Sequence, residues 1–259
     1  MEYKTLYWEK EEGIATVTFN RPEALNAMNT DMCLDIVAVC SELAADPDVR
    51  VVILTGGGRA FIAGADIAYM QPLTSAQALD FLNTFKAAIK AIEGLPQPTI
   101  AAVNGFAFGG GNELCLGCDI RLASEKAKFG QQEINLGIIP GGGGSQRLPR
   151  LVGWGRAMEM ALSGEAINAE EAYRIGLANR VFPHDSLLDE AKKLARLLAS
   201  KPKVALRQAK AVINASKSLD MESGLDYEIQ CCALLWSTDD QKEGMKAFLE
   251  KREPGFTGR

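Results

Sequence analysis

The stretch that decides the fold is TIAAVNGFAFGGGNELCLGCDIRLA, residues 99–123. Its first five residues form a short apolar and β-branched run that is typical of a buried strand. Glycines follow at 105 and 109–111, a helix can begin at Gly111 or Asn112, and residues 119–123 resemble the next strand. Strand, glycine-rich loop, helix and strand in one run indicate a layered α/β core with functional loops at the strand ends.

The same pattern extends upstream of this stretch. Two strands flank Glu11-Glu12-Gly13 and predict a hairpin, and a further buried strand runs into Gly56-Gly57-Gly58. Apolar residues at helical spacing predict two long amphipathic helices. The elements expected before residue 99 are strands at 3–8, 14–19 and 49–55 and helices at about 31–45 and 75–93.

From about residue 150 onward, helical segments dominate. Lys201-Pro202 is a plausible junction because proline starts helices well but does not continue them. We therefore expect one core over residues 1–200 and a helical C-terminal region over 201–259. The elements expected here are helices at 154–163, 169–175, 186–200, 203–217, 221–236 and 239–252 and a strand near 178–182.

Composition excludes few classes but sets the background. The chain has 259 residues, 47% hydrophobic and 24% charged, with a net charge of −5, which is ordinary for a soluble globular protein. Nucleic acid is not expected as a partner, because phosphate binding requires clustered Lys and Arg. No apolar run approaches the roughly 18 to 20 residues that cross a bilayer. The first ten residues lack a leader pattern, so no membrane association and a cytoplasmic location are expected.

Several common catalytic motifs are missing from the sequence. None of the glycine clusters at 56–58, 109–111 and 141–144 ends in the Gly-Lys-Ser/Thr of a phosphate-binding loop or matches a dinucleotide fingerprint. His184 is the single histidine, lies in a predicted surface turn and has no nucleophile elbow to serve. Cys115 and Cys118 form a lone C-x-x-C, so we expect buried thiols, with neither a metal site nor a disulfide framework.

Two glutamates remain for acid–base chemistry. Glu113 directly follows the loop at 109–111, and Glu133 precedes the loop at 141–144. An isolated glutamate is usually a solvated surface residue, but both of these lie among apolar neighbours beside loops that expose backbone N–H groups. That setting favours a functional pair, although spacing alone does not establish it.

Three motifs resemble the enoyl-CoA hydratase (crotonase) family. They are FIAGADI at 61–67, AAVNG at 101–105 with FGGGNEL at 108–114, and FGQQEI at 129–134 leading to IPGGGG at 139–144. The resemblance extends from NRP at 20–22 to EGM at 243–245 and the tail beyond it. It implies an α/β fold with a ββα spiral core and a C-terminal helical region that serves oligomerisation and active-site closure, assembled as a homotrimer or homohexamer.

The resemblance also implies roles for individual residues. The backbone N–H groups of Ala65 and Gly110 would form an oxyanion hole for a thioester carbonyl. Glu113 would activate water and Glu133 would protonate the α-carbon, with the two roles exchanged in dehydration. Coenzyme A would be bound as part of an acyl-CoA substrate, with no separate cofactor. The residues implied in substrate and coenzyme A contact are Ala24, Ala63, Ala65, Asp66, Ile67, Gly110, Pro140, Gly141, Phe248 and Lys251.

The function implied is a lyase of fatty acid metabolism, as in β-oxidation, that adds water to a short trans-2-enoyl-CoA and gives 3-hydroxyacyl-CoA. An enoyl-CoA isomerase or another CoA-thioester enzyme of the same family is the alternative. A non-catalytic CoA-binding or RNA-binding protein on the same fold is disfavoured by the net acidity and the intact pair of acids. Asn112 and Gln132 depart from the commonest family residues, Cys and Pro, beside the two glutamates.

Overall fold

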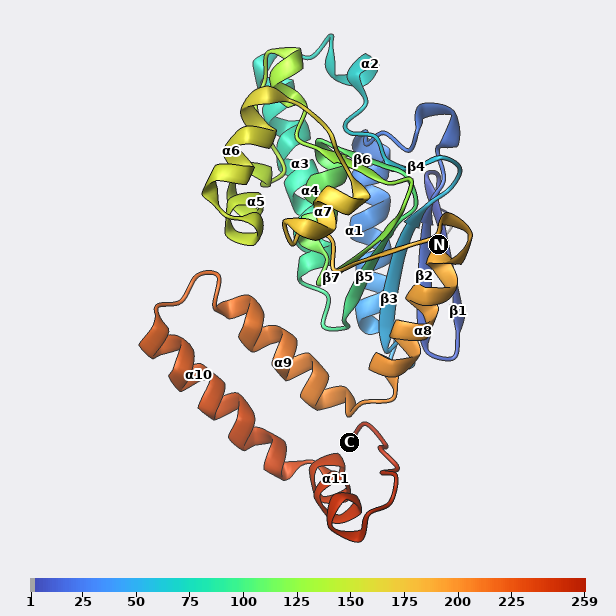
Figure 1. Cartoon of the computed structure of the whole chain (residues 1–259), viewed down its shortest axis with the longest axis vertical. Helices are drawn as coiled ribbons and strands as arrows, with labels where there is room; N and C mark the ends of the chain where they lie inside the picture. The colour runs from blue at the N-terminus through green and yellow to red at the C-terminus, as the bar shows by residue number, and fades with distance from the viewer. Residues whose placement is uncertain (1–2) are drawn as a thin grey trace.

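Two β-sheets form the centre of the computed structural model, which describes residues 3–259 and so leaves out the first two residues of the predicted core (Figure 1). The larger sheet has the strand order β1-β2-β3-β5-β7-β10, and the smaller has the order β4-β6-β8-β9. The strands of the larger sheet are Leu6–Glu11, Ile14–Phe19, Val51–Gly56, Thr99–Val103, Ile120–Ser124 and Arg180–Phe182. Those of the smaller sheet are Ala60–Ile62, Phe106–Phe108, Lys128–Gly130 and Ile167–Asn168.

The chain alternates between the sheets in a regular way. β3, β5 and β7 lie in the large sheet, and each is followed within a few residues by β4, β6 or β8 of the small sheet. A helical segment comes next: α2 (Ile67–Met70) and α3 (Ser75–Glu93) after β4, α4 (Gly110–Gly117) after β6, and α5 (Gly144–Val152) after β8. Neighbouring strands of these successive turns are parallel. This is the ββα spiral that the sequence predicts.

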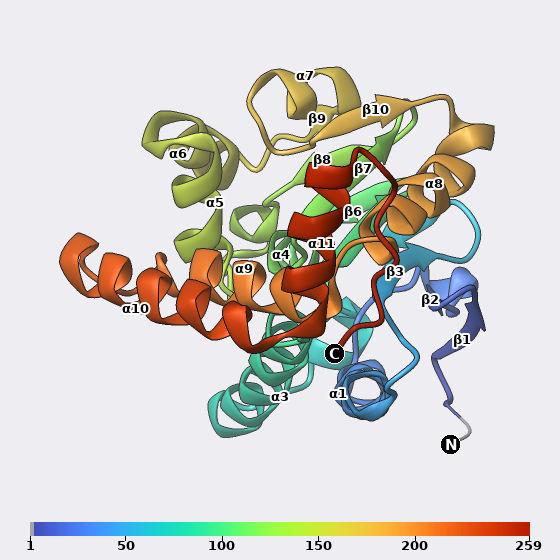
Figure 2. The same ribbon diagram turned by 90° about the horizontal axis from the view of Figure 1, so that it is seen from below.

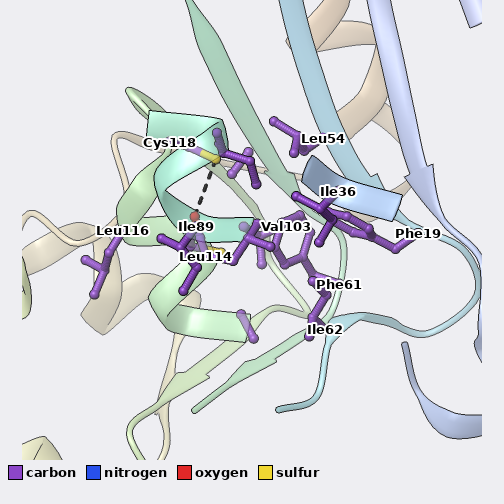
Figure 3. Close-up of a cluster of buried hydrophobic side chains, with 14 of the residues drawn as sticks. Phe19, Ile36, Leu54, Phe61, Ile62, Ile89, Val103, Leu114, Leu116 and Cys118 are labelled. Atoms are coloured by element: carbon purple, nitrogen blue, oxygen red, sulfur yellow. Dashed lines mark hydrogen bonds between the residues drawn. The ribbon is translucent and has the colours of Figure 1, made fainter. Parts of the chain in front are cut away.

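Helices cover both faces of the large sheet. β3 alternates its side chains, so that Val52 and Leu54 join one apolar cluster while Val51 and Ile53 join another. The first cluster includes buried residues of α1 (Thr30–Ala45), α3 and α4, and the second those of α8 (Leu187–Ala199). Phe19 and Phe61 meet edge to face, with ring centroids 5.5 Å apart, and join the two sheets in the core (Figure 3). The site elements are therefore built on a rigid interior.

The last three helices lie below the two sheets in Figure 1 and cross in front of them in Figure 2. They are α9 (Lys203–Ala215), α10 (Met221–Leu234) and α11 (Asp239–Glu250). No residue of α9 is buried, and Lys210 ties this helix to the core through Asp119 at 2.7 Å. α9 follows the predicted junction at residues 201–202, and the division of the chain at 200/201 stays a prediction. Along residues 3–259, we find no helix whose length and apolar character together would suit a membrane span.

The long elements were predicted well and the short ones were missed. The two upstream helices and the C-terminal ones lie where expected, including α6 (Trp154–Ser163) and α7 (Ala169–Arg174), whereas the first strand runs over 6–11 instead of 3–8. No short strand of the small sheet was predicted, because two or three residues show no periodicity. α5 was missed because glycines lead into it and Pro149 interrupts its pattern.

The six cysteines are free in the described structure, and Cys115 and Cys118 are buried as expected. Cys33 and Cys40 are also buried, on α1. Their thiols pack as small apolar side chains. His184 lies in a short 3-10 turn, where its Nδ1 is 3.0 Å from the Ser124 hydroxyl.

We expect Asn26→Ala to lower the free energy of unfolding by about 2 to 4 kcal/mol. The Asn26 side chain is fully buried, donates to the carbonyls of Gly57 and Ala60 and accepts from the N–H of Arg21. Its loss removes three hydrogen bonds to the backbone and places alanine at a φ of 57°. Urea unfolding measures the effect, with the exposed Asn83→Ala as control. Equal stabilities of the two variants would contradict the prediction.

Candidate active site

A cavity of about 250 Å³ opens beside the ends of the small-sheet strands. Its wall combines backbone-rich loops, aromatic side chains of α3 and two carboxyl groups. Both glutamates singled out in the sequence line it, so the structure brings them to one site. The residues that matter most for the chemistry are Ala65, Phe81, Phe85, Gly110, Glu113, Glu133 and Gly141.

Glu113 lies in the first turn of α4 and is almost completely buried, with 1% of its surface exposed. Its Oε1 accepts hydrogen bonds from the N–H groups of Gly142 at 2.8 Å and Gly144 at 2.7 Å. A Cβ at Gly142 would clash with Phe85 and lie 2.7 Å from the other carboxyl oxygen. Glycine in this loop is therefore required for the backbone to reach the carboxyl.

The environment of Glu113 raises its pKa to about 7. Removal from water is the largest cause, and the nearby charge of Glu133 adds to it. The hydrogen bonds from Gly144 and Gly142 and the positive charge of Arg147 act in the opposite direction and favour the carboxylate. The group therefore exchanges a proton near neutral pH, as an acid–base catalyst must.

Glu133 begins a short 3-10 helix, Glu133–Leu136, just after β8, and is half-buried. Burial raises its pKa, against an opposing hydrogen bond from Gln131 at 3.0 Å to Oε1. Its Oε2 is buried and finds no hydrogen-bond partner among residues 3–259. A buried oxygen without a partner is costly, so this oxygen is available to a molecule bound in the cavity that Glu133 lines.

Gln131 is a functional candidate that the sequence interpretation missed. Its side chain is buried, accepts a hydrogen bond from Asn112 at 2.6 Å and passes one on to Glu133. The departure at Asn112 was noticed in the sequence, but its partner was not. The sequence did hold a signal for it: Gln131 has a side-chain amide, comes directly after a buried strand residue and precedes Glu133 by two residues. Gln132, the other departure, lines the cavity and reaches the carbonyl of Gly164 at 3.4 Å.

Two backbone N–H groups of the cavity are free within the described chain. Met28 donates to the carbonyl of Gly64 and accepts from the N–H of Asp66, which turns the N–H of Ala65 between them the other way. Gly110 is the first residue of α4, where N–H groups have no intrahelical acceptor. Both residues line the cavity that holds the two glutamates. This arrangement suits an anionic oxygen.

The predicted substrate contacts divide into two groups. Ala63, Ala65, Ile67, Gly110 and Gly141 line the cavity. The other five lie outside its wall, and their contact with coenzyme A stays a prediction: Ala24 in the 3-10 turn Pro22–Ala24, Asp66, Pro140, and Phe248 and Lys251 on and after α11.

Asp66 has a structural task that the sequence did not reveal. Its carboxylate accepts the N–H of Tyr69 as the N-cap of α2 and pairs with Arg21 at 3.0 Å. These contacts fix the loop that carries Ala65. Across residues 3–259, no three His, Cys, Asp or Glu side chains lie close enough together to hold a metal ion.

Fold and site define the class of protein. A ββα spiral with a cavity at the ends of its small sheet is the architecture of the crotonase-type proteins. Comparison with known proteins agrees: the family model for enoyl-CoA hydratase/isomerase matches residues 9–259. The chain belongs to the enoyl-CoA hydratase/isomerase family.

Individual relatives match over their whole length. The chain is 47% identical over 257 residues to a crotonyl-CoA hydratase of Syntrophomonas wolfei, covering 99% of both chains. It is 44% identical over 261 residues to a short-chain-enoyl-CoA hydratase of Clostridium acetobutylicum, covering 100% of both. A crystal structure of an enoyl-CoA hydratase from Bacillus anthracis superposes with a TM-score of 0.96 at 37% identity, covering 99% of this chain and 100% of that one. The predicted fold class is confirmed.

The raised pKa of Glu113 makes a prediction about stability. The pKa of Glu113 in the folded state, about 7, lies above the ordinary 4.5. Its contribution to the free energy of unfolding is therefore fully present below pH 4.5 and is lost as the pH rises through 7. At pH 8.5 we expect the free energy of unfolding of Glu113→Gln to exceed that of the unchanged protein by on the order of 3 kcal/mol. At pH 4.5 the two values should differ little.

Urea unfolding at the two pH values measures this difference. The exposed Glu9→Gln serves as the matched control and should follow the unchanged protein at both. A constant gap between Glu113→Gln and the unchanged protein would show that Glu113 does not titrate as its surroundings require.

Proposed function

We propose that this chain is a short-chain enoyl-CoA hydratase. It adds water to a trans-2-enoyl-CoA such as crotonyl-CoA and gives the 3-hydroxyacyl-CoA. The observation that carries the proposal is the convergence, on one cavity, of two carboxyl groups with raised pKa values and two free backbone N–H groups. The relatives named as hydratases support the same reaction.

The proposed oxyanion hole consists of the N–H groups of Ala65 and Gly110. Attack of water on the β-carbon moves electrons through the conjugated system onto the thioester oxygen. Preset donors stabilise that charge, and each typically lowers the activation barrier by about 3 to 4 kcal/mol. Gly110 also starts α4, so the helix dipole favours the same negative charge.

The two carboxyls divide the proton transfers. Glu113 removes a proton from water. Burial raises its pKa to about 7, and its two backbone N–H partners limit that rise, so the carboxylate form is available at neutral pH. Glu133 gives a proton to the α-carbon, and its unpartnered Oε2 is the oxygen free to carry that proton. One hydroxyl is added to the β-carbon and one proton to the α-carbon, so the reaction balances without an oxidant or a reductant. Dehydration follows the same steps in reverse.

The shape of the cavity suits a short acyl group. Tyr69, Phe81 and Phe85 form a continuous aromatic row, with successive ring centroids 5.4 and 5.8 Å apart. Phe81 and Phe85 both line the cavity and are themselves packed into the core, so they have little room to move. The two rings therefore pack into the core and also face the cavity, where we propose that they contact the acyl group.

Glu113→Gln and Glu133→Gln should each lower kcat for crotonyl-CoA hydration by about 100-fold or more, because each removes one proton-transfer group. Loss of the conjugated-enoyl absorbance measures the rate, and the exposed Glu125→Gln is the control. Product mass separates the candidates, since hydration adds one water and isomerisation adds nothing. Near-unchanged rates in both variants, or a product of unchanged mass, would refute the proposal.

The C-terminal helices support a homo-oligomer, a trimer or a hexamer. Large apolar side chains are exposed to water on all three helices, as is typical of a surface that another subunit covers. Exposed fractions reach 82% for Phe248 and 81% for Leu249. The other large apolar residues exposed on these helices are Ile213, Met221, Leu225, Tyr227, Ile229, Leu234 and Met245.

Sedimentation should therefore give the mass of three or six chains. Replacing Ile213 and Ile229 by Glu should shift the protein to smaller species, because buried charges disfavour an apolar interface. Leu34→Glu, on the exposed side of α1, is the control. A monomeric unchanged protein at micromolar concentration would contradict this part of the proposal.

A further inference from the structure

The glycine loop that holds Glu113 has its own support, in an ion pair outside the cavity. We propose that Arg147, oriented by Glu93, is a positioning residue for the hydration: it fixes the loop at 141–144 so that two N–H groups converge on Glu113. The inference rests on the proposed function, since it concerns the same carboxyl group. Neither residue lines the cavity.

Arg147 contacts the loop at the peptide between the two donors. Its Nη1 donates to the carbonyl of Gly142 at 2.9 Å. That carbonyl belongs to the 142–143 peptide, while the peptides on either side supply the N–H groups that bind Glu113. Holding the middle peptide plane prevents it from rotating between the two donors, and so restricts the directions that both neighbouring N–H groups can take.

This loop needs such support because its sequence supplies none. Residues 141–144 are four consecutive glycines, which have the largest choice of backbone conformations. Gly143 adopts a φ of 110°, and a Cβ there would clash with the guanidinium of Arg147. The guanidinium therefore lies close against the backbone of the loop and restricts it from outside.

Glu93 holds the other arm of the guanidinium. It is the last residue of α3, and its Oε2 lies 2.7 Å from Nη2 of Arg147. Both side chains are about four-fifths shielded, with 19% and 22% exposed. Although burial opposes ionisation, the hydrogen bonds from Arg147 and Lys217 lower the pKa of Glu93. The pair thus stays charged at the pH of the reaction.

The contribution of Lys217 is minor by comparison. It reaches Oε1 of Glu93 at 2.9 Å but is 47% exposed, and solvent weakens the attraction within such exposed pairs. Arg147 makes two directed contacts through a planar fork, one to a carboxylate and one to a carbonyl. A lysine at 147 has a single ammonium group and cannot reproduce this geometry.

A purely structural role for the pair is the competing explanation. Glu93 and Arg147 join α3 to α5, and that link alone would stabilise the fold without acting on the reaction. The two explanations differ in their readouts. A structural link changes the unfolding free energy, whereas a positioning role changes kcat and the pH dependence of the folded enzyme.

The test uses full-length Arg147→Met, Arg147→Lys and Glu93→Gln with crotonyl-CoA. We expect kcat to fall about 10- to 100-fold in Arg147→Met, with KM within about threefold, because the carboxyl loses alignment rather than the substrate losing contacts. Arg147→Lys should be intermediate and Glu93→Gln milder but measurable. The control Arg174→Met breaks an exposed pair with Glu171 on α7 and should keep the unchanged rate.

The pH profile supplies a second readout. Loss of the positive charge of Arg147 raises the pKa of Glu113, so the acid limb of kcat/KM should move to higher pH in Arg147→Met. Circular dichroism and urea unfolding confirm that each variant is folded under assay conditions. If Arg147→Met does not fold, Glu93→Gln decides, because it keeps the size and removes only the charge.

The outcomes separate the two proposals. An active unchanged protein whose Arg147 and Glu93 variants keep kcat within twofold and show the same acid limb overturns the positioning role alone. A fall in activity that matches the loss of folded protein, with unchanged kcat per folded chain, overturns it as well. An unchanged protein that hydrates no enoyl-CoA overturns the proposed function together with this inference.

Discussion

The structure depends above all on a buried carboxyl group held by two backbone N–H groups. An ionised carboxylate without partners would cost several kcal/mol in this interior. The donors from Gly142 and Gly144 offset part of that cost, and the remainder is expressed as a pKa near 7 for Glu113. This incomplete compensation makes the ionised Glu113 unfavourable for stability, but it also places its pKa where the group can transfer protons at neutral pH.

The small sheet positions the other groups of the site. β4, β6 and β8 are parallel neighbours, so their ends lie along one edge. Ala65, Gly110 and Glu133 each follow one of these strands by two or three residues. The three groups are more than twenty residues apart in the chain at each step, yet the register of three short strands brings them together. The larger sheet and its helices supply the rigid support.

Sequence alone predicted the parts whose information is local. The helix at 75–93 was predicted from its apolar spacing, and the structure has it over the same residues, with Thr74 as its N-cap and Gly94 after its last residue. The small sheet was missed because its strands are formed by pairing, not by local preference. Glu113 and Glu133 were singled out by their apolar setting beside glycine-rich loops, and Ala65 and Gly110 came from the motif resemblance. The contacts of Gln131 with Asn112 and of Arg147 with Glu93 join residues remote in sequence, which no local pattern encodes.

The buried polar atoms that lack hydrogen-bond partners lie mainly at the candidate active site. Two of the three buried side-chain atoms without partners in residues 3–259 are Asn112 Oδ1 and Glu133 Oε2, at the two ends of the chain of amides through Gln131. A core selected only for stability would fill or pair such positions. Gln131 directs its amide N–H to one oxygen of Glu133 and so determines which oxygen is left free. In the proposed mechanism this free oxygen carries the proton that goes to the α-carbon, which accounts for an incomplete hydrogen-bond network in this part of the interior.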